Sequence, residues 1–198
     1  MSDQVVIHGF ETSNNFKVRA GLGFKGIDYR FETIDPADRS RLIKLSGQPF
    51  TPVMVHGDVA LFDSGAILRY LEANFRDTPQ LFSSDYGIMR EIEKWEFFGR
   101  IDLHEALMIM VRQRKAGVSD DAETARAAGI FAAATAKLEE ALSGREWLAH
   151  TRLTAADITC AAVVHRVRAM GAFEMPQDRS STYAWTDKVM AHDRGAGN

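Results

Sequence analysis

The chain is poor in cysteine, in proline and in long apolar runs, with one cysteine and five prolines in 198 residues. A single cysteine, Cys160, cannot build a disulfide framework and is typical of a protein from a reducing compartment. No apolar run approaches the roughly 20 residues that a membrane-spanning helix requires. The first ten residues lack the basic segment and apolar core of a signal peptide. We therefore expect a cytoplasmic protein with no membrane partner.

An excess of charge of either sign is missing as well. The formal net charge is −3, and the 24 Lys and Arg residues are scattered along the chain. Nucleic-acid binding depends on clustered basic residues, so we expect no nucleic-acid partner. The six histidines have no metal-ligand spacing with one another or with Cys160, so we expect no metal. The glycines at 21, 23 and 26 match a dinucleotide fingerprint by letter, but they end a predicted helix and are interpreted as its turn.

What the chain does contain is a change of pattern near residue 76. Before it, strand-like and helix-like periods alternate, which is typical of an α/β sandwich of thioredoxin type. The residues after Arg76 are rich in turn formers, and everything further on has helical period. The expected domains are an α/β domain over 1–76, a linker over 77–84 and an all-helical domain over 85–198. Its helices are expected at about 86–115, 120–143, 154–168 and 183–192.

The most informative stretch of the sequence runs from Thr51 to Leu71. Pro52 stands directly before a short β-branched run, and a hairpin with a Gly-Asp turn follows. Asp63 and Ser64 then open an amphipathic helix. Because a helix N-terminus offers unpaired N–H groups to anions, this order of elements suits a peptide-like ligand that carries an amino group and a carboxylate.

Three motifs in this order resemble those of the glutathione transferase family. They are the segment VVIHGF at 5–10 with the turn at 12–18, the acidic-Ser-x-Ala-Ile motif at 63–67, and the string LTAADI at 153–158, which resembles the family's capping motif. The resemblance spans nearly the whole chain. It implies the glutathione transferase fold, an α/β thioredoxin-like domain followed by an all-α domain. It also implies glutathione as a substrate, a second substrate in a cleft between the domains, and a homodimer.

The resemblance assigns roles to the turn after the first strand. The string Thr12-Ser13-Asn14-Asn15-Phe16-Lys17-Val18 is similar to the Thr-Pro-Asn-Gly-x-Lys-Val pattern of the bacterial nu-class group, where a threonine hydroxyl and an asparagine amide attend the sulfur. Thr12 and Asn14 are therefore the expected thiolate-stabilising pair. Ser13 replaces the proline of that pattern and is the rival hydroxyl. From the residues alone, Thr12 or Ser13 is equally an N-cap of the next helix.

The same resemblance distributes the rest of glutathione over the motif at 51–71. Pro52 is expected to be cis, with Thr51 offering its main-chain N–H and C=O to the cysteinyl unit. Ser64 is expected to bind the γ-glutamyl carboxylate, and Asp63 the ammonium group. Phe50 stands where family members often place Lys or Gln against the glycyl carboxylate. The candidates to replace that residue are Lys44, Gln48, Arg39 and Arg41.

The expected function is that of a glutathione-dependent transferase that directs the glutathione thiolate at a small-molecule electrophile. One alternative is a glutathione-dependent disulfide or peroxide reductase. Because Cys160 is expected in the core, redox turnover would use two glutathione molecules rather than a protein dithiol. A second alternative is a non-catalytic binding or interaction module with the same fold, since fold alone does not determine function.

Overall fold

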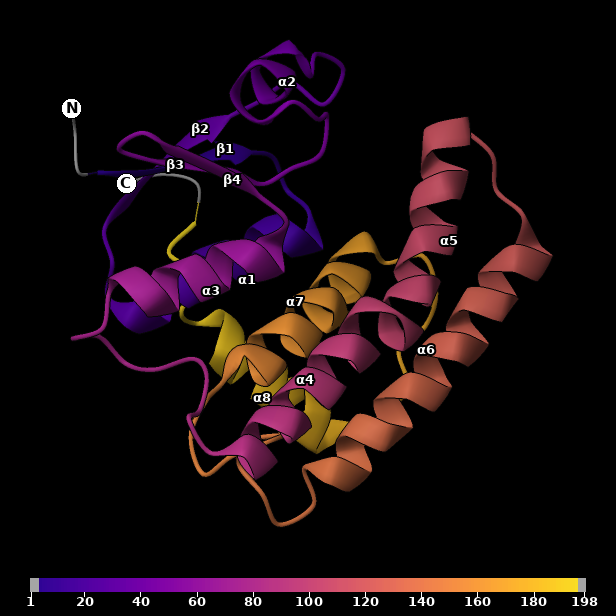
Figure 1. Cartoon of the computed structure of the whole chain (residues 1–198). Helices are drawn as coiled ribbons and strands as arrows, with labels where there is room; N and C mark the ends of the chain where they lie inside the picture. The colour runs from indigo at the N-terminus through magenta and orange to yellow at the C-terminus, as the bar shows by residue number, and fades with distance from the viewer. Residues whose placement is uncertain (1–3, 196–198) are drawn as a thin grey trace. The chain divides into compact units, whose positions relative to one another are not determined.

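The structure is a computed structural model that describes residues 4–195 of the chain (Figure 1). These residues form two compact units. The first unit contains residues 4–81 together with 191–195, and the second contains Phe82–Met190. The first is the expected α/β unit, and the second is entirely helical. Across the described residues, no helix is long and apolar enough to cross a membrane.

A four-stranded mixed sheet forms the centre of the first unit. Its strands are β1 (Val5–Gly9), β2 (Tyr29–Thr33), β3 (Val53–His56) and β4 (Val59–Phe62), in the spatial order β2-β1-β3-β4. Strand β1 is parallel to β2 and antiparallel to β3, and β3 is antiparallel to β4. This arrangement places the carboxyl end of β1 beside the amino end of β3, because His8 pairs with Val53.

Helices cover both faces of this sheet. Helices α1 (Ser13–Lys25) and α3 (Ser64–Asn74) lie on one face, and the short helix α2 (Ser40–Ser46) lies on the other (Figure 1). Ile7 and Met54 are register partners with no exposed surface, and their side chains point to the same face of the sheet. The face under α2 carries a smaller cluster made of Ile34, Leu42 and Val53.

The second unit is built from five helices, α4 (Tyr86–Arg100), α5 (Asp102–Ala116), α6 (Asp121–Ala141), α7 (Ala155–Met170) and α8 (Ser180–Met190). Helix α7 is apolar on most faces and buried along most of its length, as its sequence predicts. Thr154 and Asp157 form the predicted capping box at its start. Cys160 is a buried core residue, as predicted, and a Cβ at Gly99 would lie 3.0 Å from its Sγ.

The expected single helix over 86–115 is wrong, because the chain bends at Ile101 and forms α4 and α5 instead. Ile101 has φ −112° and ψ −73°, while its N–H still bonds to the carbonyl of Phe97 at 2.9 Å. The apolar positions continue with helical period on both sides of Ile101, and no proline marks the bend. Periodicity therefore predicts correctly that this segment is helical, and it misses the break that divides it into two helices.

The C-terminal residues also differ from the expected domain boundaries. We expected 85–198 to form one domain, but the residues after α8 group with the first unit. The physical reason is a set of polar contacts with α1 and β2, including the ion pair between Arg19 and Asp193 at 2.8 Å. The tail was expected to fray from Arg194, yet Arg194 and Gly195 both make hydrogen bonds. The expectation for 196–198 lies outside the described residues.

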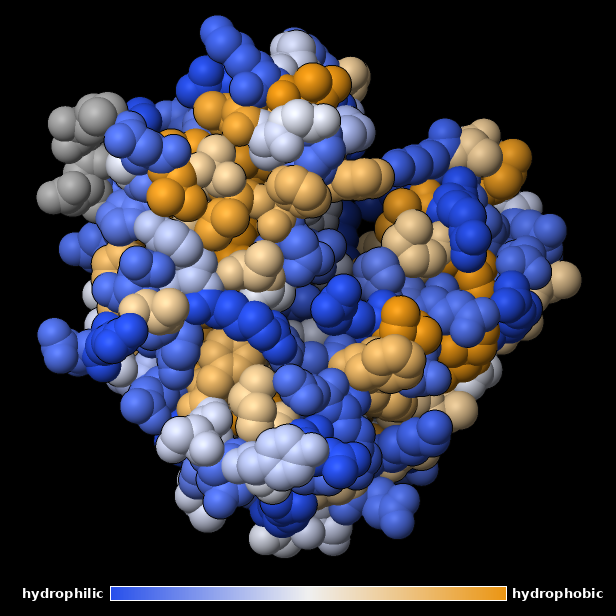
Figure 2. All heavy atoms as spheres, in the orientation of Figure 1, coloured by the Kyte–Doolittle hydropathy of each residue, from blue (hydrophilic) through white to orange (hydrophobic). Residues whose placement is uncertain are grey.

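Apolar side chains also reach the surface of the first unit, and Figure 2 shows them gathered over the region of α2 and β4. The large exposed apolar residues of this region include Ile43, Phe50 and Phe62. Phe50 is 72% exposed, so the position that often carries Lys or Gln in the family has an apolar surface side chain here.

Candidate functional site

The turn between β1 and α1 is organised around the hydroxyl of Thr12. Thr12 is the N-cap of α1, and its Oγ1 accepts hydrogen bonds from the main-chain N of Asn15 at 3.2 Å and from Asn15 Nδ2 at 2.9 Å. A hydroxyl has two acceptor lone pairs and one proton. Both lone pairs are used by Asn15, and the proton has no acceptor among the described residues. The local structure therefore turns Thr12 into a hydrogen-bond donor at the start of a helix.

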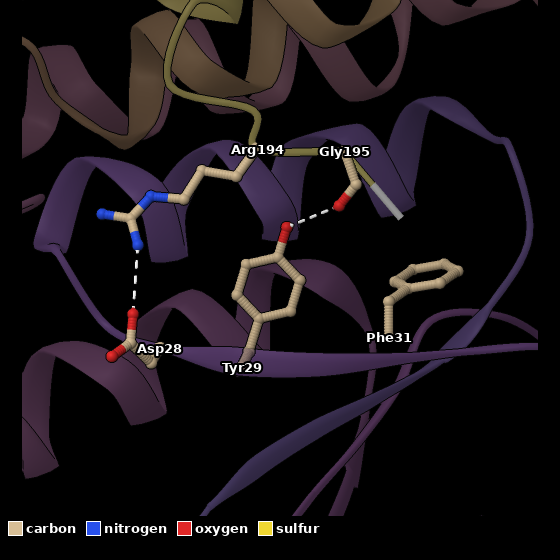
Figure 3. Close-up of a pocket in the computed structure, with 5 residues that line it drawn as sticks. All are labelled: Asp28, Tyr29, Phe31, Arg194 and Gly195. Atoms are coloured by element: carbon tan, nitrogen blue, oxygen red, sulfur yellow. Dashed lines mark hydrogen bonds and ion pairs between the residues drawn. The ribbon is translucent and has the colours of Figure 1, made fainter. Parts of the chain in front are cut away.

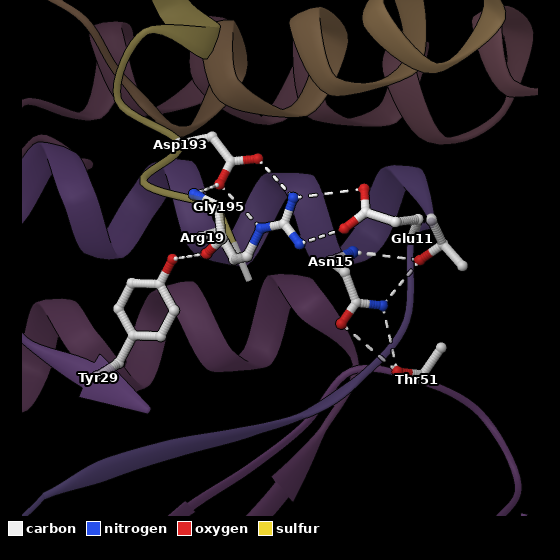
Figure 4. Close-up of polar contacts among 8 residues, drawn as sticks. Glu11, Asn15, Arg19, Tyr29, Thr51, Asp193 and Gly195 are labelled. Carbon is white, nitrogen blue, oxygen red and sulfur yellow. Dashed lines mark hydrogen bonds and ion pairs between the residues drawn. The ribbon is translucent and has the colours of Figure 1, made fainter. Parts of the chain in front are cut away.

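Asn15 joins this turn to the loop before β3 (Figure 4). Its side chain is completely buried, and its Nδ2 also donates to Thr51 Oγ1 at 3.1 Å. The Thr51 hydroxyl in turn donates to the carbonyl of His8 at the end of β1, at 3.2 Å. Both amide hydrogens of Asn15 are thus satisfied, and one side chain fixes Thr12 and Thr51 relative to β1.

Gly9 is the residue that leaves room for this network. A Cβ at position 9 would lie 2.0 Å from Asn15 Oδ1 and 2.4 Å from Thr51 Oγ1. Both distances are far below van der Waals contact, so any larger residue at this position would displace Asn15 or Thr51. The last residue of β1 therefore has to be glycine for a steric reason rather than for a special backbone angle.

A second connection joins α1 to the start of α3. Ser64 Oγ donates to Asn14 Oδ1 at 3.2 Å, and Ser64 is only 4% exposed. This bond occupies the carbonyl oxygen of Asn14 and leaves its amide nitrogen, Nδ2, without an acceptor in the described part of the chain. Two predicted site residues that are 50 positions apart are thus brought together, with the donor group of Asn14 unused.

Asp63 adopts an unusual backbone conformation at the N-terminus of α3. It is the one non-glycine residue with a positive φ in the described residues, with φ 67° and ψ 118°. Its Oδ1 accepts from the N–H groups of Gly65 and Ala66 at 2.9 and 3.1 Å. Such strained conformations concentrate at ligand-binding sites. Two of the N–H groups that we expected to meet a ligand carboxylate are consequently already bonded to Asp63, and its Oδ2 is the oxygen left for an ammonium group.

The segment before β3 has the predicted cis bond between Thr51 and Pro52. The main-chain N–H and C=O of Thr51 have no hydrogen-bond partner within residues 4–195. Gln48 bonds within its own loop, where Nε2 donates to Phe50 O at 3.2 Å and Oε1 accepts from Phe50 N at 2.5 Å. The main-chain N–H and C=O of Thr51 are therefore unused in the described part of the chain, whereas Gln48 stabilises the loop.

The basic candidates for a glycyl carboxylate differ in their contacts. Arg39 donates to the carbonyls of Pro36 at 2.7 Å and Pro49 at 3.3 Å, and it lies over the ring of Phe10 at 4.4 Å. Lys44 and Arg41 on α2 are exposed. The loop before β3 is thus tied to Arg39, and no contact selects one of the four candidates. Ser13, the rival hydroxyl, is 4% exposed and less accessible than Thr12.

A surface pocket of the first unit lies elsewhere. It has about 290 Å³ of empty space, part of it open to solvent, and is lined by Asp28, Tyr29, Phe31, Arg194 and Gly195 (Figure 3). None of these residues belongs to the predicted site. Within residues 4–195, no group of three or more His, Cys, Asp or Glu side chains is arranged to hold a metal ion.

Sequence reasoning missed two residues of the site, Asn15 and Gly9. Asn15 was treated only as part of a family motif, although it stands three residues after Thr12, the spacing of a capping box. A search for polar residues at that spacing would have found it. Gly9 carries no signal in the sequence, since its role depends on Thr51. Thr51 lies in the loop before β3, the strand that pairs with β1.

Comparison with family models matches both units. Residues 7–79 match the model described as glutathione S-transferase, N-terminal domain, and residues 121–188 match glutathione S-transferase, C-terminal domain. Among curated proteins, glutathione S-transferase 1 of Dianthus caryophyllus is 33% identical over 85 residues, covering 40% of this chain and 38% of its own length. A glutathione S-transferase of Triticum aestivum is 34% identical over 105 residues, which is 48% of this chain and 49% of the relative. The chain therefore spans less than half the length of these two relatives.

Longer matches have lower identity. Glutathione S-transferase U12 of Arabidopsis thaliana is 25% identical over 195 residues, covering 90% of this chain and 74% of its own length. A solved glutathione S-transferase from Rhodospirillum rubrum superposes with a TM-score of 0.83 at 20% identity, over 94% of this chain and 87% of its own. The structure of Ure2p in complex with glutathione superposes with a TM-score of 0.81 at 19% identity, over 96% of each chain. These structures establish a shared fold.

Proposed function

Because the chain belongs to the glutathione S-transferase family, we propose that it binds glutathione in its α/β unit and uses the thiolate as a nucleophile against a small-molecule electrophile. In this proposal the Thr12 hydroxyl donates to the sulfur and the Asn14 amide supports it. The observation that carries the proposal is the double acceptance by Thr12 Oγ1 from Asn15, which leaves the hydroxyl proton for a ligand.

The chemistry required of Thr12 is modest. A glutathione thiol resembles free cysteine, with a pKa near 8.5, and only the thiolate is a good nucleophile. Lowering that pKa by about two units needs about 2.7 kcal/mol of differential stabilisation. One donated hydrogen bond to a charged group contributes about 1.5–3 kcal/mol, and the N-terminus of the 13-residue helix α1 adds about 0.3–1 kcal/mol. Together the two terms contribute about 1.8–4 kcal/mol, a range that includes the free energy required.

The rest of glutathione has matching partners in the same unit. Thr51 offers its main-chain N–H and C=O to the cysteinyl unit, in the manner of a short β-pairing. The Asp63 carboxylate pairs with the ligand's ammonium group. Ser64 at the N-terminus of α3 meets the γ-carboxylate with its main-chain N–H, because its hydroxyl proton is donated to Asn14. Gln48 acts indirectly in this proposal, by holding the loop that carries Thr51. We also propose that the active protein is a homodimer, and analytical ultracentrifugation at micromolar concentration measures this directly.

The test is calorimetric titration with glutathione, combined with turnover assays on an aryl halide and on a small glutathionyl disulfide. Thr12→Val keeps the side-chain shape and removes the hydroxyl. We expect saturable glutathione binding in both proteins. At about pH 5.5, below both thiol pKa values, turnover is expected to be about tenfold or more lower in Thr12→Val, since each unit of thiol pKa is then worth a factor of ten in thiolate. Faster turnover of the disulfide than of the aryl halide would show that the protein is a glutathione-dependent reductase rather than a transferase.

Two variants control this experiment. Asp120→Ala removes an N-cap bond of 3.0 Å from α6 in the helical unit, so it matches the capping loss of Thr12→Val without touching the proposed site. Ser13→Ala tests the rival hydroxyl. Wild-type activity is expected in both. A loss in Ser13→Ala with none in Thr12→Val would transfer the role to Ser13, and absence of glutathione binding would leave the non-catalytic module as the better description.

A further inference from the structure

Arg19 is a charged residue in the middle of α1 with a side chain that is only 3% exposed. Burying a guanidinium is costly unless it is paired and hydrogen-bonded. Arg19 has two carboxylate partners, Glu11 at 2.6 Å and Asp193 at 2.8 Å (Figure 4). Its face also lies near the rings of Phe16 and Phe31, at 5.0 and 5.2 Å from their centroids.

The carboxylate of Asp193 binds the guanidinium of Arg19 in a bidentate manner. Asp193 Oδ1 accepts from Arg19 Nε and Oδ2 from Arg19 Nη2, both at 2.8 Å. Asp193 Oδ1 also accepts from the N–H of Gly195 at 2.9 Å, and the carbonyl of Gly195 accepts from the Tyr29 hydroxyl at 2.9 Å. We call residues 191–195 the C-terminal strap. Its contacts with α1 and β2 hold Asp193 in a fixed place against Arg19.

The strap also approaches the backbone of α1 closely. A Cβ at Gly23 would lie 1.8 Å from the carbonyl oxygen of His192, so only glycine fits at that position. The rings of His192 and Phe24 meet edge to face with centroids 5.3 Å apart. These contacts are independent of Arg19. The strap is therefore a built part of the α/β unit and a firm anchor for the guanidinium.

The other partner, Glu11, immediately precedes Thr12. Its side chain is 53% exposed, and its described contacts are with Arg19 alone, through Nη1 at 2.6 Å and Nη2 at 3.5 Å. A carboxylate beside the proposed thiolate site disfavours a second negative charge there. Pairing with Arg19 offsets that effect and holds the residue that leads into the Thr12 cap. Although burial opposes the charge, hydrogen bonds to Asp193 and Glu11 keep the pKa of Arg19 above its usual value.

We propose that Arg19 is a positioning residue of the thiolate site, which holds and neutralises Glu11 beside Thr12 while the C-terminal strap anchors the guanidinium through Asp193. This inference rests on the proposed function for its effect on the thiol. It assigns a task to a residue pair that lies 174 positions apart in the sequence and that touches no part of glutathione in the proposed binding mode.

Charge gives the proposal a signature that loss of packing alone would not produce. Arg19→Met keeps the aliphatic stem and leaves two carboxylates unpaired, so the pKa of the bound thiol is expected to rise by about 1 unit. Asp193→Asn weakens the anchor of the guanidinium but leaves Arg19 charged and paired with Glu11, so a smaller rise is expected. The double variant Glu11→Gln with Arg19→Met is expected to remove at least about half of this rise, because only one unpaired carboxylate, Asp193, remains.

A second readout needs no glutathione. The N–H groups of Asn15 and Phe16 bond to Thr12 Oγ1 and Thr12 O, so their hydrogen exchange reports directly on the turn. We expect exchange over residues 11–16 to be about tenfold faster in Arg19→Met than in the wild type. Arg194→Met is the matched control, because it removes an exposed strap cation that bonds to Asp28 at 3.2 Å. Its exchange over 11–16 is expected to equal that of the wild type.

The outcomes separate this proposal from the proposed function. Equal exchange in Arg19→Met and Arg194→Met, or equal rises of the thiol pKa in Arg19→Met and Asp193→Asn, would overturn the positioning role. If the wild-type protein binds no glutathione, the proposed function fails. The exchange comparison then still decides whether Arg19 and the strap hold the turn.

Discussion

Replacing Asn15 with alanine tests whether the site is held together by one buried side chain. Asn15 donates two hydrogen bonds from a completely buried amide, to Thr12 Oγ1 at 2.9 Å and to Thr51 Oγ1 at 3.1 Å. Each such bond contributes about 0.5–1.5 kcal/mol, so their joint loss is about 2 kcal/mol. Removal of the buried side-chain atoms adds about 1 kcal/mol. We therefore expect Asn15→Ala to lower the free energy of unfolding by about 3 kcal/mol.

The assay is urea denaturation followed by circular dichroism, for Asn15→Ala, Thr51→Val and the double variant. Thr51→Val keeps the shape of the side chain and removes its hydroxyl. Because the two residues share a hydrogen bond, the double variant is expected to be less destabilised than the sum, with a coupling of about 1 kcal/mol. Additive effects within about 0.3 kcal/mol, or a loss below about 0.5 kcal/mol in Asn15→Ala, would refute the network.

Three further predictions concern other residues. Gly9→Ala is expected to cost at least as much stability as Asn15→Ala in the same denaturation assay, because its Cβ would lie 2.0 Å from Asn15 Oδ1. Its control is Gly129→Ala, at a helical position where a Cβ would meet nothing within 4 Å, and this variant is expected to gain about 1 kcal/mol. Burial lowers the pKa of His8, whose Nδ1 has no hydrogen-bond partner in the described part of the chain. The free energy of unfolding of the wild type is therefore expected to fall as the pH drops below 6.5, by at most about 1.4 kcal/mol per pH unit. His8→Leu is expected to flatten that slope. Asp157→Ala removes a buried carboxylate that accepts four hydrogen bonds, and thermal melts are expected to show a loss of about 3–5 kcal/mol, with a loss under 1 kcal/mol contradicting its structural role.

The direction of the His8 effect follows from the side of the sheet on which it lies. His8 is 4% exposed on the face that α2 covers, since it pairs with Val53, and the charged groups that act on it are Arg41 on α2 and Glu32 and Arg30 on β2. The folded protein disfavours the imidazolium more than the unfolded chain does. Below the unfolded value of 6.5, the unfolded state therefore binds more protons, and acid favours unfolding.

Local signals in the sequence were sufficient for most of the fold. The capping box of Thr154 and Asp157 and the cap at Asp63 lie within a few residues of the groups that they bond, so their helices start where the sequence predicts. The bend at Ile101 was missed because the helical period continues across it. The alternation of strand and helix periods predicted the α/β unit. It did not predict the order of the strands, because β2 and β3 are consecutive in the chain but lie on either side of β1.

The contacts among the candidate site residues were predictable only where those residues are neighbours in the sequence. Thr12 was identified both as an N-cap and as the candidate hydroxyl, and these readings are compatible, because capping uses the oxygen lone pairs and leaves the proton. The contact of Asn15 with Thr51 depends on the register of β1 and β3. The contact of Arg19 with Asp193 joins the two ends of the chain, and no local pattern encodes it.

The most direct test of the central claim is an ultraviolet titration of the thiol of bound glutathione, in the wild type and in Thr12→Val. The thiolate absorbs where the thiol does not, so the midpoint gives the pKa of the sulfur in the site. We predict a midpoint about two units below the roughly 8.5 of the free thiol in the wild type, and a rise of at least about one unit in Thr12→Val. Equal midpoints in the two proteins, with glutathione bound to both, would contradict the role assigned to Thr12.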